Sequence, residues 1–218
     1  REVDMLKNLR QTYIPQVYDF VQQDGVVYTV MDYIEGESLD KILARGEKIS
    51  QPDIVKWSCQ LLEALDYLHH QGPHGILHGD IKPANIMLTP QGNICLIDFN
   101  ISFFMDENTV LGYTEGYTSP EQYIIALDKK SIHAIPNHTV VDEKSDIYSV
   151  GATFYHLITG HKLERRRSGR EYEELQEHVS EGLASVIMKA IVLERDKRYA
   201  NAYEMYQAFQ NICKKDKR

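Results

Sequence analysis

The hydrophobic positions of the chain follow a strand-like pattern at first and a helical pattern later. Residues 13–20 and 26–33 are rich in Val, Ile and Tyr and flank an Asp-Gly pair, which predicts two strands joined by a turn. Residues 50–72 begin with a Ser-x-Pro-Asp start signal and continue with apolar residues at helical spacing. Residues 86–88 and 94–97 predict a second, shorter hairpin. The pattern indicates an α+β fold.

The C-terminal half predicts helices. Residues 146–158 are apolar almost all round, which is typical of a buried helix, and Gly160 is a C-terminal cap signal. Residues 183–191 and 202–212 predict two amphipathic helices that close the fold, whereas residues 164–177 are strongly charged and predict a surface segment. The predicted class is therefore α+β, mainly α.

Composition narrows the class of protein. The chain has 218 residues, 43% of them hydrophobic, which suffices for one substantial domain with its own core. Its net charge of -8 argues against a nucleic-acid partner. Three isolated cysteines, Cys59, Cys95 and Cys213, form no C-x-x-C pair and predict buried or incidental thiols in a reducing compartment. With no signal peptide and no apolar run long enough for a membrane span, we expect a cytoplasmic protein.

Two short segments carry the candidate chemistry. Residues 78–88 read HGDIKPANIML and residues 96–100 read LIDFN. They resemble the catalytic loop and the metal-binding loop of the eukaryotic-type (Hanks-type) Ser/Thr protein kinases, which carry the motifs HRDxKxxN and DFG. The combination resembles the bacterial members of that family in particular. Asp80 and Asn85, each taken alone, fit equally well as turn residues beside Pro83.

The resemblance implies a role for each polar residue of these segments. Asp80 would orient the attacking hydroxyl and accept its proton, and Lys82 would stabilise the transferring phosphoryl group. Asn85 and Asp98 would hold Mg²⁺, which prefers hard oxygen ligands. His78 would be structural, packed beneath Phe99, and would transfer no proton.

Further family motifs follow in the expected order. Residues 112–121, GYTEGYTSPE, resemble the Ser/Thr-kinase pattern GTxGYxxPE, in which Thr114 would hydrogen-bond the catalytic Asp and Lys and favour Ser/Thr substrates. Glu121 needs a buried partner, because an unpaired buried charge is costly, and Arg198 stands where the family places that partner. Asp146 begins a DxxSxG motif and would hold the backbone of the catalytic loop.

The resemblance places a nucleotide site near the N-terminus. Residues 30–36 resemble the kinase hinge, whose backbone binds adenine, so Met31 would be the gatekeeper and Asp32 and Ile34 would border the nucleotide. Met87 would lie under the adenine ring. Glu2, on a helix predicted by the spacing of Glu2, Leu6 and Leu9, would pair with a strand lysine that holds the ATP phosphates; a solvated charge is the alternative.

Three departures from the family pattern stand out. The chain contains no glycine-rich loop and no Val-Ala-Ile-Lys strand, so most of the small N-terminal lobe is missing, and with it the phosphate cradle. Gly79 replaces the arginine of HRD, and Asn100 replaces the glycine of DFG. The chain starts at Arg1, which indicates a processed piece or a missing beginning. We expect this chain alone to transfer phosphate poorly.

Two other functions fit part of the sequence. Aminoglycoside and choline phosphotransferases use HGDxxxxN followed by an IDF or IDW step, which residues 78–85 and 97–99 also match. Lys82, Thr114 and the SPE and DxxSxG motifs favour the protein kinase. The third hypothesis is a pseudokinase that uses the fold for binding only.

The sequence therefore predicts a kinase-like C-terminal lobe with a few remaining N-lobe elements, namely the end of the helix called αC, two strands and the hinge. The expected boundaries are 1–34 for the residual N-lobe and hinge, 35–213 for the C-lobe and 214–218 for a basic tail. Residues 124–136 would be an insertion near the substrate side. Expected partners are ATP with Mg²⁺ and a protein substrate. The tail is compatible with a membrane anchor beyond it, and the oligomeric state stays open.

Overall fold

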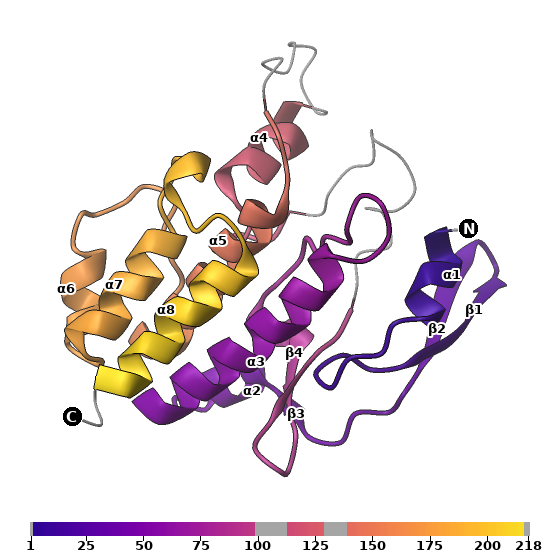
Figure 1. The fold of residues 1–218 in the computed structure, drawn as a ribbon, viewed down its shortest axis with the longest axis horizontal. Coiled ribbons are helices and arrows are strands. Elements are labelled where there is room, and N and C mark those ends of the chain that lie inside the picture. The colour runs from indigo at the N-terminus through magenta and orange to yellow at the C-terminus, as the bar shows by residue number, and fades with distance from the viewer. Residues whose placement is uncertain (1, 99–112, 129–138, 216–218) are drawn as a thin grey trace.

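The N-terminal part of the chain forms a small hairpin beside a larger helical part (Figure 1). The computed structural model describes residues 2–98, 113–128 and 139–215. The N-terminal elements are α1 (Glu2–Lys7), β1 (Val17–Gln23) and β2 (Val26–Met31). The helices of the larger part are α2 (Leu39–Ala44), α3 (Gln51–His69), α4 (Pro120–Asp128), α5 (Glu143–Thr159), α6 (Glu171–Gln176), α7 (Glu181–Ala190) and α8 (Ala202–Lys215).

The hairpin of β1 and β2 is antiparallel, as the sequence pattern predicts, but its limits differ from the prediction. Val17 lies opposite Met31, and a bulge separates Val17 from Asp19. Residues 13–16 lie outside the strand because Pro15 has no N–H to donate to a ladder. Every residue of β2 except its last is exposed, so this hairpin has little core of its own.

A second sheet of three short strands joins the two parts of the molecule. It contains β3 (Glu37–Ser38), β4 (Ile86–Leu88) and β5 (Ile94–Leu96), all antiparallel and in the order β3-β4-β5. Gly36, directly before β3, allows the chain to approach the end of β4 closely, because a Cβ at that position would lie 2.0 Å from the carbonyl oxygen of Leu88. The Leu96 N–H donates to the Tyr13 carbonyl at 2.8 Å, which connects the sheet to the segment before β1.

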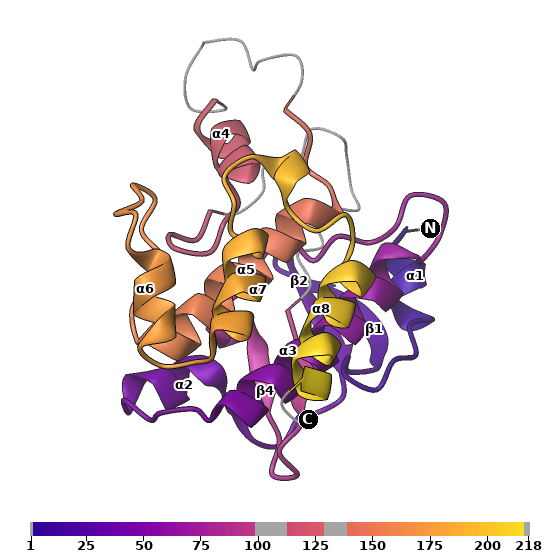
Figure 2. The ribbon, with the colours of Figure 1, turned by 60° about the vertical axis from the view of Figure 1, so that its left-hand side comes forward.

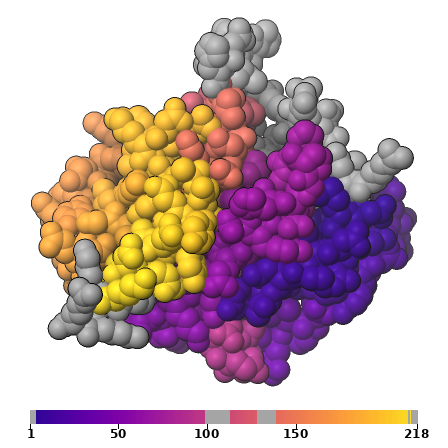
Figure 3. Space-filling view, in the orientation of Figure 1, coloured from indigo at the N-terminus to yellow at the C-terminus, as the bar shows by residue number. Residues whose placement is uncertain are grey.

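Helix α3 is the centre of the larger part. Its capping residue, Ser50, accepts the Asp53 N–H at 3.2 Å, and its apolar face is buried as predicted. Leu61 and Leu65 are completely buried. Figure 3 shows α8 packed against α3 on this face, and Figures 1 and 2 show α3, α7 and α8 side by side.

Helix α5 is the buried helix that the sequence predicts. Asp142 caps its first turn by accepting the Lys144 N–H at 3.0 Å, and Gly160 ends it with a left-handed φ of 82°. Gly151 allows close packing on α7, because a Cβ there would lie 2.8 Å from the Cβ of Ala190. Helix α5 thereby becomes a fixed support beneath the loops that follow α3 and precede α4.

Two features of the fold were not predicted in this form. Residues 124–128, expected to begin an insertion, continue helix α4, and the rest of that stretch to residue 136 lies almost entirely outside the described residues. The charged stretch 164–177 contains the short helix α6, in which Glu171 is buried. None of the helices in the described part of the chain combines the length and the apolar character that a bilayer span requires.

Candidate active site

The structure brings Asp80, Lys82 and Thr114 into direct contact. The Thr114 hydroxyl donates to Oδ1 of Asp80 at 3.0 Å, and Nζ of Lys82 lies 3.0 Å from Oδ2 of Asp80. Nζ of Lys82 also donates to Thr114 Oγ1 at 3.3 Å. The side chains of Asp80 and Lys82 are 26% and 25% exposed, so the cluster is accessible to a substrate without being fully solvated. These contacts fit the predicted catalytic set.

Asn85 completes this cluster. It lies at the end of the short 3₁₀ turn η1 (Pro83–Asn85), which places it beside Asp80. Its Nδ2 donates to the Asp80 carbonyl at 2.8 Å and to Oδ2 of Asp80 at 3.2 Å. The amide nitrogen is therefore committed to Asp80. The amide oxygen makes no hydrogen bond within the described residues and is the atom that can bind a metal ion.

Asp98 follows directly after β5 and its neighbour Ile97. The Ile97 N–H donates to the Asn85 carbonyl at 2.9 Å, so the two predicted metal ligands are carried by segments that are hydrogen-bonded to each other. Asp98 is exposed and has a left-handed φ of 56°, which Asp tolerates better than most residues. Asn100, whose effect on this turn the sequence raised, lies outside the described residues.

Asn85 and Asp98 together fit Mg²⁺. That ion is commonly held by one or two carboxylates together with substrate phosphates and water, so two protein oxygen ligands are sufficient. Clusters of three or more His, Cys, Asp or Glu side chains with the arrangement of a metal site are absent from the part of the chain that the structure describes.

Asp146, at the start of α5, holds the catalytic loop by its backbone. Its Oδ1 accepts the Gly79 N–H, and its Oδ2 accepts the His78 N–H and Nε2 of His69, each at 2.9 Å. Burial alone would disfavour the carboxylate, but the hydrogen bond and charge of His69, with smaller contributions from His78 and the Gly79 N–H, hold the pKa of Asp146 below its ordinary value. The predicted backbone-holding role of Asp146 is confirmed.

His78 has the geometry of a structural residue, as predicted. Its Nε2 lies 2.9 Å from the Ile97 carbonyl, and its Nδ1 accepts the Asp80 N–H at 3.2 Å, so both ring nitrogens are satisfied when the proton is on Nε2. Burial lowers the pKa of His78 and keeps the ring neutral. Phe99, expected to pack on it, lies outside the described residues.

The predicted hinge lies between β2 and β3. The Asp32 carboxylate accepts the Gln16 N–H at 3.0 Å and the Tyr18 hydroxyl at 2.6 Å. The Asp32 side chain thus fixes the hinge to β1, and its predicted place beside a nucleotide stays a prediction. Ile34 makes no backbone hydrogen bond within the described residues, which leaves its N–H and carbonyl available to a nucleotide base.

Of the remaining residues predicted to bind the nucleotide, the structure describes Met31 and Met87 in full and only the backbone of Glu2. Met31 ends β2 and packs, half-buried, against the core. Met87 is in β4, half-buried, with Ser38 opposite it on one side and Cys95 on the other. The backbone of Glu2 begins α1, but its side chain lies outside what the structure describes, so its predicted pairing stays a prediction.

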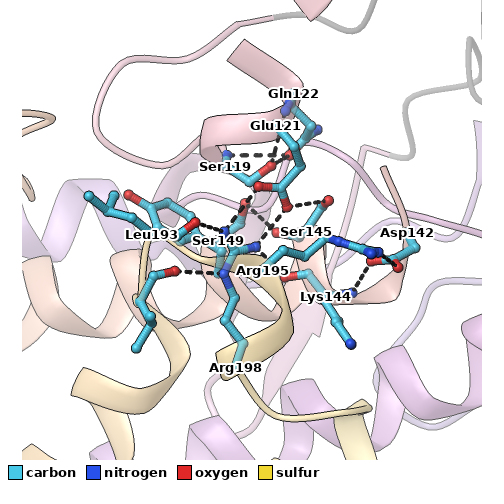
Figure 4. A network of polar contacts seen from close by, with 12 residues as sticks. Ser119, Glu121, Gln122, Asp142, Lys144, Ser145, Ser149, Leu193, Arg195 and Arg198 are labelled. Atoms are coloured by element: carbon cyan, nitrogen blue, oxygen red, sulfur yellow. Dashed lines mark hydrogen bonds and ion pairs between the residues drawn. The ribbon is translucent and has the colours of Figure 1, made fainter. Parts of the chain in front are cut away.

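The Glu121–Arg198 pair is present as predicted (Figure 4). The guanidinium binds both carboxylate oxygens, at 2.7 and 3.0 Å, and its other donors bind the carbonyls of Val192, Lys144 and Leu193. Ser145 also donates to Glu121, at 2.7 Å. Burial disfavours the charge of Glu121, but Arg198 outweighs that effect and lowers its pKa. The pair is buried and saturated, which is typical of a structural bridge.

Two positioning residues were missed in the sequence. His69 binds Asp146, and Gln122 donates to the Gly79 carbonyl at 3.0 Å while accepting the Ser119 hydroxyl at 2.9 Å. A signal existed for His69, because it continues the four-residue spacing of Leu61 and Leu65 on the buried face of α3. The sequence gives no comparable signal for Gln122.

A hairpin and hinge beside a helical part that presents an Asp-Lys-Asn-Thr cluster is the architecture of the protein kinase fold. A family model described as the protein kinase domain matches residues 1–218, so the chain belongs to that family. The kinase domain of Mycobacterium tuberculosis PknI has a similar structure, with a TM-score of 0.75 and 23% identity over 97% of this chain and 76% of that one.

Proteins with similar sequences are also named as serine/threonine-protein kinases. A probable serine/threonine-protein kinase of Streptomyces coelicolor is 29% identical over 225 residues, which cover 94% of this chain and 32% of the relative. The serine/threonine-protein kinase PrkC of Bacillus subtilis is 27% identical over 226 residues, which cover 94% of this chain and 32% of PrkC. The chain thus spans about a third of the length of these relatives.

Proposed function

We propose that this chain is the catalytic lobe of a Ser/Thr protein kinase that transfers the γ-phosphoryl group of ATP to protein hydroxyls. The observation that carries the proposal is the contact of four side chains, Asp80, Lys82, Asn85 and Thr114, in one partly exposed cluster. Membership of the protein kinase family and the names of the relatives support the substrate class.

Asp80 is equipped to orient a hydroxyl. A carboxylate offers about four acceptor sites, and three on Asp80 are taken by Thr114, Lys82 and Asn85. The remaining site can accept a Ser or Thr hydroxyl and then its proton. Because the three protein contacts fix the carboxylate in place, the incoming hydroxyl meets a group that needs no reorganisation.

Lys82 supplies positive charge next to this acceptor. Its ammonium contacts both Asp80 and Thr114 and remains 25% exposed, so it can also reach an oxygen of the transferring phosphoryl group. Mg²⁺ held by Asn85 and Asp98 would neutralise charge on the ATP phosphates. Nucleotide binding would involve the backbone of Ile34 and the side chains of Met31 and Met87, which border the hinge and β4.

The 218-residue chain alone is expected to transfer phosphate weakly or not at all. The sequence holds no glycine-rich loop and no Val-Ala-Ile-Lys strand to cradle the phosphates, and positioning is nearly the whole of this catalysis. The exposed apolar residues of the hairpin, including Val26, Val27 and Tyr28, form a surface that a larger N-terminal lobe would cover. The second candidate is a pseudokinase that only binds its partners. The absence of these phosphate-binding elements from this sequence favours it.

A transfer assay with labelled ATP and Mg²⁺ tests the proposal. The full-length gene product, its Asp80→Asn variant and the 218-residue chain would each receive a Ser/Thr-rich acceptor protein and, separately, an aminoglycoside. We expect label on the protein acceptor and a loss of about 10²- to 10⁴-fold in the variant. Label on the aminoglycoside would identify a small-molecule phosphotransferase. No label from a folded full-length protein would favour the pseudokinase, and rapid turnover by the short chain would contradict its expected weakness.

A further inference from the structure

One of two neighbouring cavities borders the catalytic cluster. The first, of about 470 Å³, is lined by Lys82 and Thr114 of the cluster and also by Asp40, His156 and Lys162. The second, of about 590 Å³, lies along the segment from Tyr113 to Pro120 and the first residues after α5. Lys162 lines both. Because the first cavity extends from Lys82 and Thr114 to Lys162, a peptide that brings its hydroxyl to Asp80 can reach Lys162 through this cavity.

The backbone of the segment before α4 fixes the position of Lys162. Gly116 has a left-handed φ of 92°, and a Cβ on it would lie 3.1 Å from both Cβ and Cδ of Lys162. The lysine stem thus rests on a glycine that has no side chain to displace it. Its ammonium lies 5.5 Å from the centre of the Tyr117 ring, a weak attraction that orients the group without neutralising it.

Among the described residues, Lys162 has no carboxylate partner. No Asp or Glu of the described residues lies within ion-pair distance of its Nζ, whereas the other lysine of the first cavity, Lys82, is paired with Asp80. Burial and the nearby Lys162 lower the pKa of His156, so this histidine is neutral at pH 7 and adds no positive charge to the cavity. Asp40 is the one carboxylate that lines this cavity among the described residues.

The second cavity is more evenly charged. Arg165 lines it together with Glu115 and Glu164, and the guanidinium stacks on the ring of Tyr123. Because Lys162 also lines this cavity, its two cations balance its two carboxylates, and Lys162 is the cation that it shares with the cavity beside the catalytic cluster.

We propose that Lys162 is a specificity-determining residue that selects protein substrates with a negatively charged side chain, carboxylate or phosphate, close to the phosphorylated Ser or Thr. This inference rests on the proposed kinase function and adds the chemical class of its substrates. A negative group at that place gains an ion pair with the exposed ammonium of Lys162, and a basic residue at the same place is repelled.

Matched peptides test this assignment. Peptides would share one Ser and differ only at one flanking position at a time, which holds Glu, Gln, Lys or phosphoserine. The full-length gene product would be assayed for kcat/KM, and the 218-residue chain for peptide binding by fluorescence anisotropy. We expect Glu to exceed Gln by about 3- to 10-fold at one or more flanking positions, the size of an ion pair near a protein surface. If the phosphoserine peptide is used better than the Glu peptide, and Lys162→Gln removes this difference, phosphate is the favoured anion.

A charge reversal supplies the decisive variant. Lys162→Glu should reverse the preference toward the Lys peptide, and Lys162→Gln should abolish it. Arg166→Glu is the matched control, because Arg166 is exposed, near in sequence and lines neither cavity, so the same charge change there should leave the preference intact. Melting temperatures of all variants would show that each is folded.

The outcomes separate this inference from the proposed function. Asp80-dependent labelling of the acceptor protein with equal use of Glu and Gln peptides would overturn the role of Lys162 and leave the kinase intact. An equal loss of preference in Lys162→Glu and Arg166→Glu would also overturn it, since bulk charge would then be the cause. If nothing is labelled, the kinase proposal fails. Tighter binding of the Glu peptide than of the Gln peptide, lost in Lys162→Glu, would then still support an anion site at Lys162, and equal binding would overturn it.

Discussion

The polar cluster around Asp80 and the polar pair of Glu121 with Arg198 use similar side chains in opposite ways. The Arg198 side chain is completely buried and all five of its donors have acceptors, so no part of it is available to a ligand. Asp80 is 26% exposed and keeps one acceptor site open. Saturation and burial make one network a stabilising element, whereas incomplete saturation at the surface of the other leaves it able to bind a substrate.

The two networks are similar in composition but differ in their surroundings. Both networks contain a cation beside a carboxylate. What differs is the number of hydrogen bonds that the surrounding backbone supplies, three carbonyls to Arg198 and none to Lys82 among the described residues. Removal of a partner should therefore change stability at one network and phosphoryl transfer at the other.

The largest expected effect is on stability, from Arg198→Ala. The change leaves Glu121 as a buried carboxylate without its cation, which costs about 3–5 kcal/mol of unfolding free energy. Thermal and urea unfolding would measure it, with a drop in melting temperature on the order of 10 °C. Arg170→Ala is the control, because the Arg170–Glu173 pair is 68% exposed on both sides and should contribute about 1 kcal/mol or less. An equal, small effect of both changes would remove Arg198 from its structural role.

A smaller effect, on transfer, is expected from Thr114→Ala. The variant loses the hydroxyl that donates to Asp80 and accepts from Lys82, and a hydrogen bond to a charged group contributes about 1.5–3 kcal/mol. That range corresponds to roughly 10- to 100-fold in kcat/KM of the full-length gene product. Thr114→Ser keeps the hydroxyl and should retain most of the activity. A change in melting temperature as large as that of Arg198→Ala would mean that this cluster is structural too.

The smallest expected effect is a change in the pH dependence of stability, from His78→Asn. Burial lowers the pKa of His78 from 6.5, so between the lowered pKa and 6.5 the unfolded chain binds a proton that the folded chain does not. Stability is therefore full above pH 6.5 and falls as the pH decreases, until the folded-state pKa is reached. Urea unfolding between pH 5 and 7.5 should show a flatter dependence in the variant. His74→Asn, at an exposed histidine, is the control and should leave the slope unchanged.

Much of this organisation could be predicted from the sequence because it depends on local signals. Ser50 and Gly160 mark helix ends through their capping chemistry, and the spacing of Leu61 and Leu65 marks a buried face. The spacing of Asp80, Lys82 and Asn85 within one loop predicts that these residues lie close together. The cost of an unpaired buried charge predicted a partner for Glu121, and the resemblance to the family identified Arg198 as that partner.

Other features depend on contacts that no local signal encodes. Gln122 reaches the Gly79 carbonyl only because α4 packs beneath the catalytic loop, and Lys162 reaches the cavities only because Gly116 leaves space for its stem. The first strand begins later than its Val and Tyr content suggests, because Pro15 interrupts the ladder. In each case tertiary packing, or the absence of one N–H, overrides propensity.

Helix α5 connects the two networks through successive turns. Ser145 binds Glu121, Asp146 binds the catalytic loop, and Ser149 donates to the Tyr117 carbonyl in the segment that carries Thr114. Neighbouring residues of a helix differ by only about 1.5 Å in height along its axis, so the three attachments move together. Substitutions in the first turns of α5 should therefore be pleiotropic. Selection on this stretch would act on folding and on catalysis at once, and neither property could evolve there independently.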